Sequence, residues 1–288
     1  MDKNVIACRD THLREVDAPD VWSAMKKIGI TGVEVWVEFD RTCANLFYPD
    51  KKYSLQSTES IADLSKDLKE NGLTITSFCM GNRFEERPEE ELTWVAEVVQ
   101  ASKELDVKAI RIDFIPRKME RDDYLKFAIS IGKRLVERVQ GTDIRYGIEN
   151  HGSITNDPEF LDPLFEGVGS DALGLTLDTG NFYWYGHPLN SLYDIYKKYA
   201  SRTWHTHCKS IHYPEDKRDI QRERGWEYGN YCCPIYDGDI DFAKVAAILK
   251  AVDYTGDFCI ENESLGRFAK EERERILRKE AAFLHQLV

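Results

Sequence analysis

The chain has 288 residues, of which 42% are hydrophobic and 31% are charged, and its formal net charge at pH 7 is −12. This length admits two small domains or one large α/β barrel, because such barrels run to about 250 residues as a single domain. The negative charge disfavours nucleic acid as the main partner, and no apolar run approaches the ~20 residues that a membrane helix needs.

The first residues lack a basic segment followed by a sustained apolar stretch, so we expect no secretory signal and a cytoplasmic location. The seven cysteines are an odd number, and most lie inside apolar patterns that predict strands. We therefore expect reduced, buried thiols and no disulfide framework. No Cys-x-x-Cys pair is present, which leaves only a weak signal for a structural zinc site.

Short apolar segments alternate along the chain with segments of helical periodicity. Asn71-Gly72 is typical of a helix end, and Pro88 with three glutamates behind it is typical of a helix start. The expected strands are residues 4–8, 32–38, 73–79, 107–114, 145–149, 173–178, 203–208 and 257–261. The expected helices are residues 19–28, 59–70, 88–105, 121–139, 157–165, 191–199, 240–252 and 270–287.

Eight strand-then-helix units without a break in composition predict parallel strands joined by crossover helices. Because eight such units can close on themselves, we predict a (β/α)8 TIM barrel of the α/β class, with residues 1–288 as a single domain. An open sheet of six or seven strands is the alternative. In residues 210–238 the apolar residues have neither the helical nor the strand spacing. We expect a lid or a dimer contact there, which leaves a homo-oligomer open.

Alternation within the strands predicts which side chains enter the barrel. In the strand at residues 173–178, three leucines face the helices and the residues between them face inward. The inward set predicted in this way is Gly147, Glu149, Gly174, Thr176, Asp178, Thr203, His205, His207, Cys259 and Glu261. A one-residue bulge in the strand at residues 203–208 would exchange its histidines for their neighbours.

Four consecutive strands thus end in inward polar residues, at the end of a barrel where active sites lie. These are Glu149, Asp178, a histidine of the His205-Thr206-His207 segment, and Glu261. Three carboxylates and one imidazole form a mostly hard, oxygen-rich ligand set. Such a set suits Mn²⁺, Mg²⁺ or Co²⁺ with positions open for substrate oxygens, and Zn²⁺ is an alternative.

Four segments stand out by their order and spacing along the chain. They are Ile148-Glu149-Asn150-His151, Leu177-Asp178-Thr179-Gly180-Asn181, His205-Thr206-His207-Cys208-Lys209, and Tyr236-Asp237-Gly238-Asp239-Ile240-Asp241-Phe242 followed by Cys259-Ile260-Glu261. Together they resemble the xylose isomerase-like TIM barrel superfamily, and within it the sugar phosphate isomerase/epimerase group. The resemblance covers nearly the whole chain. It implies one divalent metal ion, with Mn²⁺ favoured, held by Glu149, Asp178, His207 and Glu261.

The resemblance also implies that Glu149 and Glu261 act as an acid/base pair. Ketohexose 3-epimerases of this type carry a histidine three residues after the metal aspartate and an arginine six residues after the metal histidine. This chain has Asn181 and Tyr213 at those positions, which disfavours that subtype.

At such a site the substrate carbonyl and an adjacent hydroxyl would chelate the metal while one glutamate removes the α-proton to give an enediolate. Return of the proton to the other face is epimerisation, and return to the neighbouring carbon is aldose–ketose isomerisation. We therefore predict a metal-dependent isomerase or epimerase of a sugar or sugar derivative. Loss of a β-substituent from the same enediolate would make a lyase or dehydratase of a keto sugar or keto-glycoside, which is the alternative.

Further polar side chains near the strand ends are candidates to bind a small carbohydrate substrate, with Trp36 placed to stack on a sugar face. These candidates are Trp36, Glu38, Arg111, Asp113, His151, Asn181, His205 and Lys209. For the charged ones the alternative is an interior ion-pair network.

Two rival functions are less favoured. An endonuclease IV-like DNA repair enzyme would share this fold, but its three-zinc cluster needs histidines on earlier strands. Here His12 is the only histidine before His151. A sugar-binding barrel without catalysis would be expected to lose one of the two glutamates, and both are present.

Overall fold

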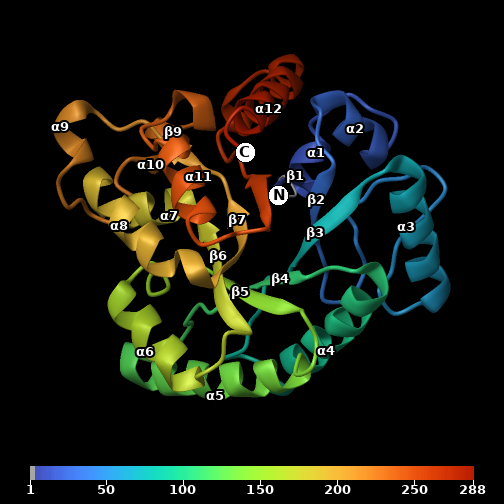
Figure 1. Cartoon of the computed structure of the whole chain (residues 1–288), viewed down its shortest axis with the longest axis horizontal. Helices are drawn as coiled ribbons and strands as arrows, with labels where there is room; N and C mark the ends of the chain where they lie inside the picture. The colour runs from blue at the N-terminus through green and yellow to red at the C-terminus, as the bar shows by residue number, and fades with distance from the viewer. Residues whose placement is uncertain (1–3) are drawn as a thin grey trace.

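The eight parallel strands pair into one nearly closed barrel with the helices around its outside (Figure 1). The computed structural model describes residues 4–288. In their order around the barrel, the strands are β10 (Asp257–Ile260), β1 (Val5–Arg9), β2 (Gly32–Trp36), β3 (Thr74–Cys79), β4 (Ala109–Ile112), β5 (Arg145–Glu149), β6 (Leu173–Asp178) and β7 (Thr203–His207). Just beyond β7, Cys208 bridges to Ile260 and its amide donates to the carbonyl of Cys259 at 2.7 Å. The predicted TIM barrel is confirmed, and the open-sheet alternative is wrong.

The helices follow the predicted alternation, with four short additions. In chain order, the helices are α1 (Asp10–Leu13), α2 (Val21–Ile28), α3 (Thr58–Asn71), α4 (Pro88–Leu105), α5 (Arg121–Arg138), α6 (Pro158–Val168), α7 (Thr179–Tyr185), α8 (Leu189–Tyr199), α9 (Glu215–Arg218), α10 (Tyr228–Tyr231), α11 (Phe242–Lys250) and α12 (Lys270–His285). The additions are α1, α7, α9 and α10. As predicted, α3 ends where Gly72 takes a φ of 66°, and α4 begins at Pro88. Sequence periodicity misses α1 and α7, because α1 has only four residues and most of α7 is buried.

A bulge in β7 decides which of its side chains enter the barrel. Thr203 pairs with Leu175 of β6, but the next pair is Thr176 with His205, so Trp204 is the extra residue. Since the bulge comes before His205, both histidines keep the predicted inward face. The hydroxyl of Thr203 instead donates to the carbonyl of Tyr199 at the end of α8. The prediction that Thr203 faces the interior is therefore wrong.

Gly174 occupies a position of β6 where a side chain has no room. A Cβ there would lie 2.0 Å from the carbonyl oxygen of Arg202 and 2.4 Å from Nε1 of Trp204. We expect Gly174→Ala to lower the free energy of unfolding in urea by about 3 kcal/mol, because backbone must shift to admit the methyl group. Gly229→Ala is the matched control, since nothing lies within 4 Å of its added methyl. Equal stabilities of the two variants would contradict this account.

The segment from residue 210 to 238 is an ordered excursion at the end of β7. Its strands β8 (Ser210–Ile211) and β9 (Cys232–Cys233) pair in antiparallel fashion. The guanidinium of Arg222 lies 4.4 Å from the ring centres of both Tyr183 and Tyr213, and it donates to the carbonyls of Tyr183 and His187 at 3.0 Å. These contacts tie the excursion to α7. Whether it serves as a lid or a dimer contact stays a prediction.

All seven cysteines are free thiols, six of them buried, as predicted. Within residues 4–288, every helix falls short of the length and hydrophobicity needed to cross a membrane.

Candidate functional site

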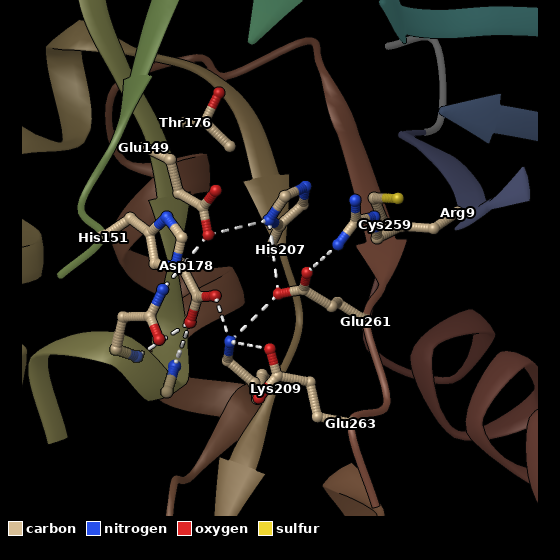
Figure 2. Close-up of polar contacts among 12 residues, drawn as sticks. Arg9, Glu149, His151, Thr176, Asp178, His207, Lys209, Cys259, Glu261 and Glu263 are labelled. Atoms are coloured by element: carbon tan, nitrogen blue, oxygen red, sulfur yellow. Dashed lines mark hydrogen bonds and ion pairs between the residues drawn. The ribbon is translucent and has the colours of Figure 1, made fainter. Parts of the chain in front are cut away.

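The four side chains of the expected ligand set meet at the C-terminal end of the barrel (Figure 2). Glu149 ends β5, Asp178 ends β6, His207 ends β7, and Glu261 directly follows β10. One nitrogen or oxygen of each side chain lies within 4.8 Å of those of the other three. None is more than 3% exposed. Parallel strands bring these distant residues together because their C-terminal ends share one rim.

His207 turns one ring nitrogen toward this cluster and the other away from it. Its Nε2 lies 2.9 Å from Oε1 of Glu34. Because a carboxylate only accepts hydrogen bonds, Nε2 carries a proton. Burial would lower the pKa of His207, but the surrounding glutamates outweigh it and raise this pKa well above its usual value, so the ring is charged until a cation replaces the proton of Nδ1. This Nδ1 lies 3.3 Å from Glu149 and 3.4 Å from Glu261, and finds no hydrogen-bond partner among the described residues. A buried imidazole oriented in this way by a carboxylate is suited to hold a metal.

An arginine holds the far oxygen of each glutamate. Arg111 donates through Nε to Oε2 of Glu149 at 2.7 Å, and Arg9 donates to Oε1 of Glu261. The remaining oxygens, Oε1 of Glu149 and Oε2 of Glu261, are those that approach His207. The two carboxylates therefore both approach Nδ1 of His207 (Figure 2).

Backbone contacts fix the third carboxylate. Oδ1 of Asp178 caps α7 by accepting from the amides of Gly180 and Asn181, each at 2.8 Å. The side chain of Asn150 bonds both backbone groups of Asp178, at 2.8 and 2.9 Å. Oδ2 of Asp178 is left facing the cluster, 2.8 Å from Nζ of Lys209.

The electrostatics of the cluster suit a bound cation. Burial alone would raise the pKa of Glu149, but Arg111 and His207 outweigh it and hold this pKa well below its usual range. Burial would also raise the pKa of Glu261, but His207 and Lys209 outweigh it and hold this pKa well below its usual range. For Asp178, burial is the largest effect and raises the pKa well above its usual range in spite of the nearby Lys209. Three buried carboxylates and one imidazole, with two of the carboxylates held ionised, form a donor set that fits a divalent metal.

Most of the expected substrate contacts surround this cluster. Nζ of Lys209 lies 3.1 Å from Glu261 and 3.2 Å from Glu263. The side chain of Asn181 donates to Oε1 of Glu149 at 3.1 Å. His151 is the accessible member, with its side chain 46% exposed.

Arg111 and Asp113 form an ion pair of 2.8 Å at the edge of the cluster. Nδ1 of His151 lies 3.2 Å from Asp113, and the hydrogen bond between them raises the pKa of this histidine. The interior ion-pair network that was the alternative reading of these residues is therefore present. A substrate contact for each stays a prediction.

Three of the residues predicted to bind substrate make other contacts in the structure. His205 is fully buried, and its two ring nitrogens lie 2.8 Å from Asp257 and 3.2 Å from Glu34. Both ring nitrogens thus face carboxylates, and a direct substrate contact by His205 stays a prediction. Glu38 lies beyond the end of β2, in a turn where its amide donates to the carbonyl of Thr42. Trp36 packs on Gly81, at the start of the loop that follows β3.

Sequence reasoning missed two residues of this network, Glu34 and Arg9. Oε1 of Glu34 contacts both His207 and His205, and its Oε2 lies 3.0 Å from Nε of Arg9. Arg9 in turn reaches Glu261, so Glu34 connects two members of the cluster. The available signal was a charged residue between Val33 and Val35 on the inward face of a valine-rich strand.

A parallel eight-stranded barrel that gathers three carboxylates and an imidazole at its C-terminal rim is a TIM barrel with a candidate metal centre. Residues 22–287 match the model of the family described as xylose isomerase-like TIM barrel, and the chain belongs to this family.

Individual relatives are more distant. An inosose dehydratase of Clostridium perfringens (strain ATCC 13124) is 27% identical over 117 residues, which are 39% of this chain and 38% of the relative. The matched part thus spans about two fifths of that relative. The IOLI protein, solved with a zinc atom, superposes with a TM-score of 0.70 at 16% identity over 97% of each chain. A xylose isomerase-like TIM barrel protein of Mycobacterium smegmatis, solved with magnesium, gives 0.63 at 17% identity over 98% of each chain. These structures show the shared fold.

Proposed function

We propose that this chain is a divalent-metal-dependent isomerase or epimerase of a sugar or sugar derivative, which removes a proton α to a carbonyl. The observation that carries the proposal is the pair of glutamates that both approach Nδ1 of His207, each with its other oxygen held by an arginine. Two carboxylates facing one small space are suited to take a proton from one position of a substrate and return it to another.

Glu149, Asp178, His207 and Glu261 would hold one cation, and their mostly oxygen donors favour Mn²⁺ or Mg²⁺ over Zn²⁺. The zinc and magnesium found in two structural relatives support a metal here without deciding which. When bound, a divalent cation would polarise the substrate carbonyl and offset the negative charge that develops on its oxygen.

The protein side chains supply the proton transfers and hold the substrate. The lowered pKa values of Glu149 and Glu261 keep both carboxylates ionised at neutral pH, so either is in the form that accepts a proton. One glutamate takes the α-proton, and protonation from the other side gives the epimer. Lys209, Asn181 and the accessible His151 would bind hydroxyl groups of the substrate around this space.

Dehydration is the second candidate, and the position of Lys209 favours it. Its ammonium group lies within 3.1 Å of both Asp178 and Glu261. After a glutamate removes the α-proton, the bond from the β-carbon to its hydroxyl would break, and Lys209 would donate a proton so that water leaves. The likeness to an inosose dehydratase supports this reaction class for a cyclic keto polyol.

The test is hydrogen exchange in D₂O with a panel of ketohexoses, inososes and 3-keto-glycosides, after loading the protein with Mn²⁺. We expect one α-hydrogen of a substrate to exchange, as seen by proton NMR, and exchange to stop when EDTA strips the metal. A new sugar isomer would identify the isomerase or epimerase, whereas an unsaturated ketone would identify the dehydratase. Failure of the metal-loaded protein to exchange any member of the panel would contradict proton abstraction.

A further inference from the structure

A second group of potential metal ligands lies beside the first and shares one residue with it. Asp113, Glu149 and His151 each offer one atom within 4.8 Å of the others, and Glu149 is also a member of the four-residue cluster. A carboxylate common to two ligand groups is the usual arrangement where two metal ions lie about 3.5–4 Å apart.

The guanidinium of Arg111 lies within this second group. Its Nη1 is 2.8 Å from Oδ2 of Asp113, and its Nε is 2.7 Å from Oε2 of Glu149. A further bond of 3.0 Å from Nη1 to the carbonyl of Met80 fixes its orientation. Arg111 and both carboxylates are at most 7% exposed. One buried cation is therefore held between the two acidic members of the group.

A guanidinium and a metal ion neutralise these carboxylates in the same way but differ in their chemistry. Arginine keeps its charge at all ordinary pH values and has only donors, so it has no open position for a substrate oxygen and cannot generate hydroxide from water. A centre with one exchangeable cation and one fixed guanidinium suits proton abstraction. It does not suit the in-line displacement at phosphorus that two metal ions support.

We propose that Arg111 fills the second cation position of this centre, so that the chain binds one divalent ion, and that loss of the guanidinium opens a second metal site at Asp113, Glu149 and His151. This inference rests on the proposed metal dependence of the function. The half-exposed side chain of His151 connects the second position to solvent, so an ion can reach it once the guanidinium is removed.

The experiment measures metal content and uses four forms of the full chain. Wild type, Arg111→Ala, Arg111→Lys and the double variant Arg111→Ala with Asp113→Asn are equilibrated with Mn²⁺, desalted and analysed for metal per chain. We expect one ion in wild type, two in Arg111→Ala, one in Arg111→Lys because a fixed positive charge remains, and one in the double variant because a ligand is lost. Spin coupling between two Mn²⁺ ions should appear in electron paramagnetic resonance of Arg111→Ala alone.

The outcomes separate this inference from the proposed function. A folded Arg111→Ala that binds one ion, or a wild type that binds two, would overturn the role of Arg111 and leave the metal-dependent function intact. A folded wild type that binds no ion would overturn both. Arg111→Gln is the second variant in case Arg111→Ala does not fold. Its polar side chain is neutral, so it too should bind two ions, and one ion in that variant counts against the proposal.

Discussion

Glu261→Gln is expected to lower turnover by about 10³-fold, in the range that loss of a general acid or base produces. The amide keeps the shape of the side chain and one oxygen, but it cannot accept the α-proton of the substrate. Turnover and deuterium exchange are measured together with the metal content, so that loss of a base is distinguished from loss of a ligand. Glu149→Gln tests the other carboxylate. In an epimerase, one of the two variants should still exchange hydrogen from one face while forming no epimer.

Glu263→Gln is the control for this prediction. It removes a glutamate charge two residues away that contacts the same Lys209, but its side chain is 43% exposed and lies outside the four-residue cluster. We expect a loss of less than about tenfold, as for a peripheral charge that contributes little. A metal-bound Glu261→Gln that is as active as Glu263→Gln would remove Glu261 from the reaction.

Glu34→Ala is expected to weaken metal binding by about 10- to 100-fold, which is the usual effect of removing a carboxylate that orients a metal-binding histidine. The reason is the bond of 2.9 Å to Nε2 of His207, which directs Nδ1 toward the cluster. The same change leaves Arg9 with one carboxylate partner fewer in a buried site. We therefore also expect a loss of about 3 kcal/mol in the free energy of unfolding, measured by urea titration without metal.

Glu34→Gln is the matched variant, because its amide oxygen can still accept the proton of Nε2. It should bind metal more tightly than Glu34→Ala. Nitrogen NMR of the His207 ring in the metal-loaded proteins distinguishes orientation of this ring by Glu34 from a purely structural role of Glu34. The proton should lie on Nε2 in wild type and in Glu34→Gln. Unchanged metal affinity in a folded Glu34→Ala would show that Glu34 does not orient His207.

Local patterns were enough to predict the barrel and much of the cluster. Glu149 and Asp178 end buried strands and Glu261 directly follows one, and the apolar alternation of these strands is regular, so phase alone places the three residues on the inward face. Helix signals such as Gly72 and Pro88 act within one turn of the backbone, and the corresponding boundaries agree with the structure.

Pairing between strands was not readable from these patterns. The bulge at Trp204 depends on how β7 aligns with β6, and it turned Thr203 outward while leaving His205 and His207 in place. The excursion after β7 likewise has no regular spacing of apolar residues in its sequence. It is held to α7 by contacts of an arginine with aromatic rings, and such contacts need no repeated apolar face.

The sequence by itself determined the class of fold and the end of the barrel where the carboxylates gather, because strand alternation and helix capping are local properties of the chain. Only the tertiary structure decided how these groups are charged and held. Glu34 meets His207, and Arg111 lies between Asp113 and Glu149, through side chains that cross the barrel interior from different strands. Such contacts depend on distances between strands, which no spacing along the sequence encodes.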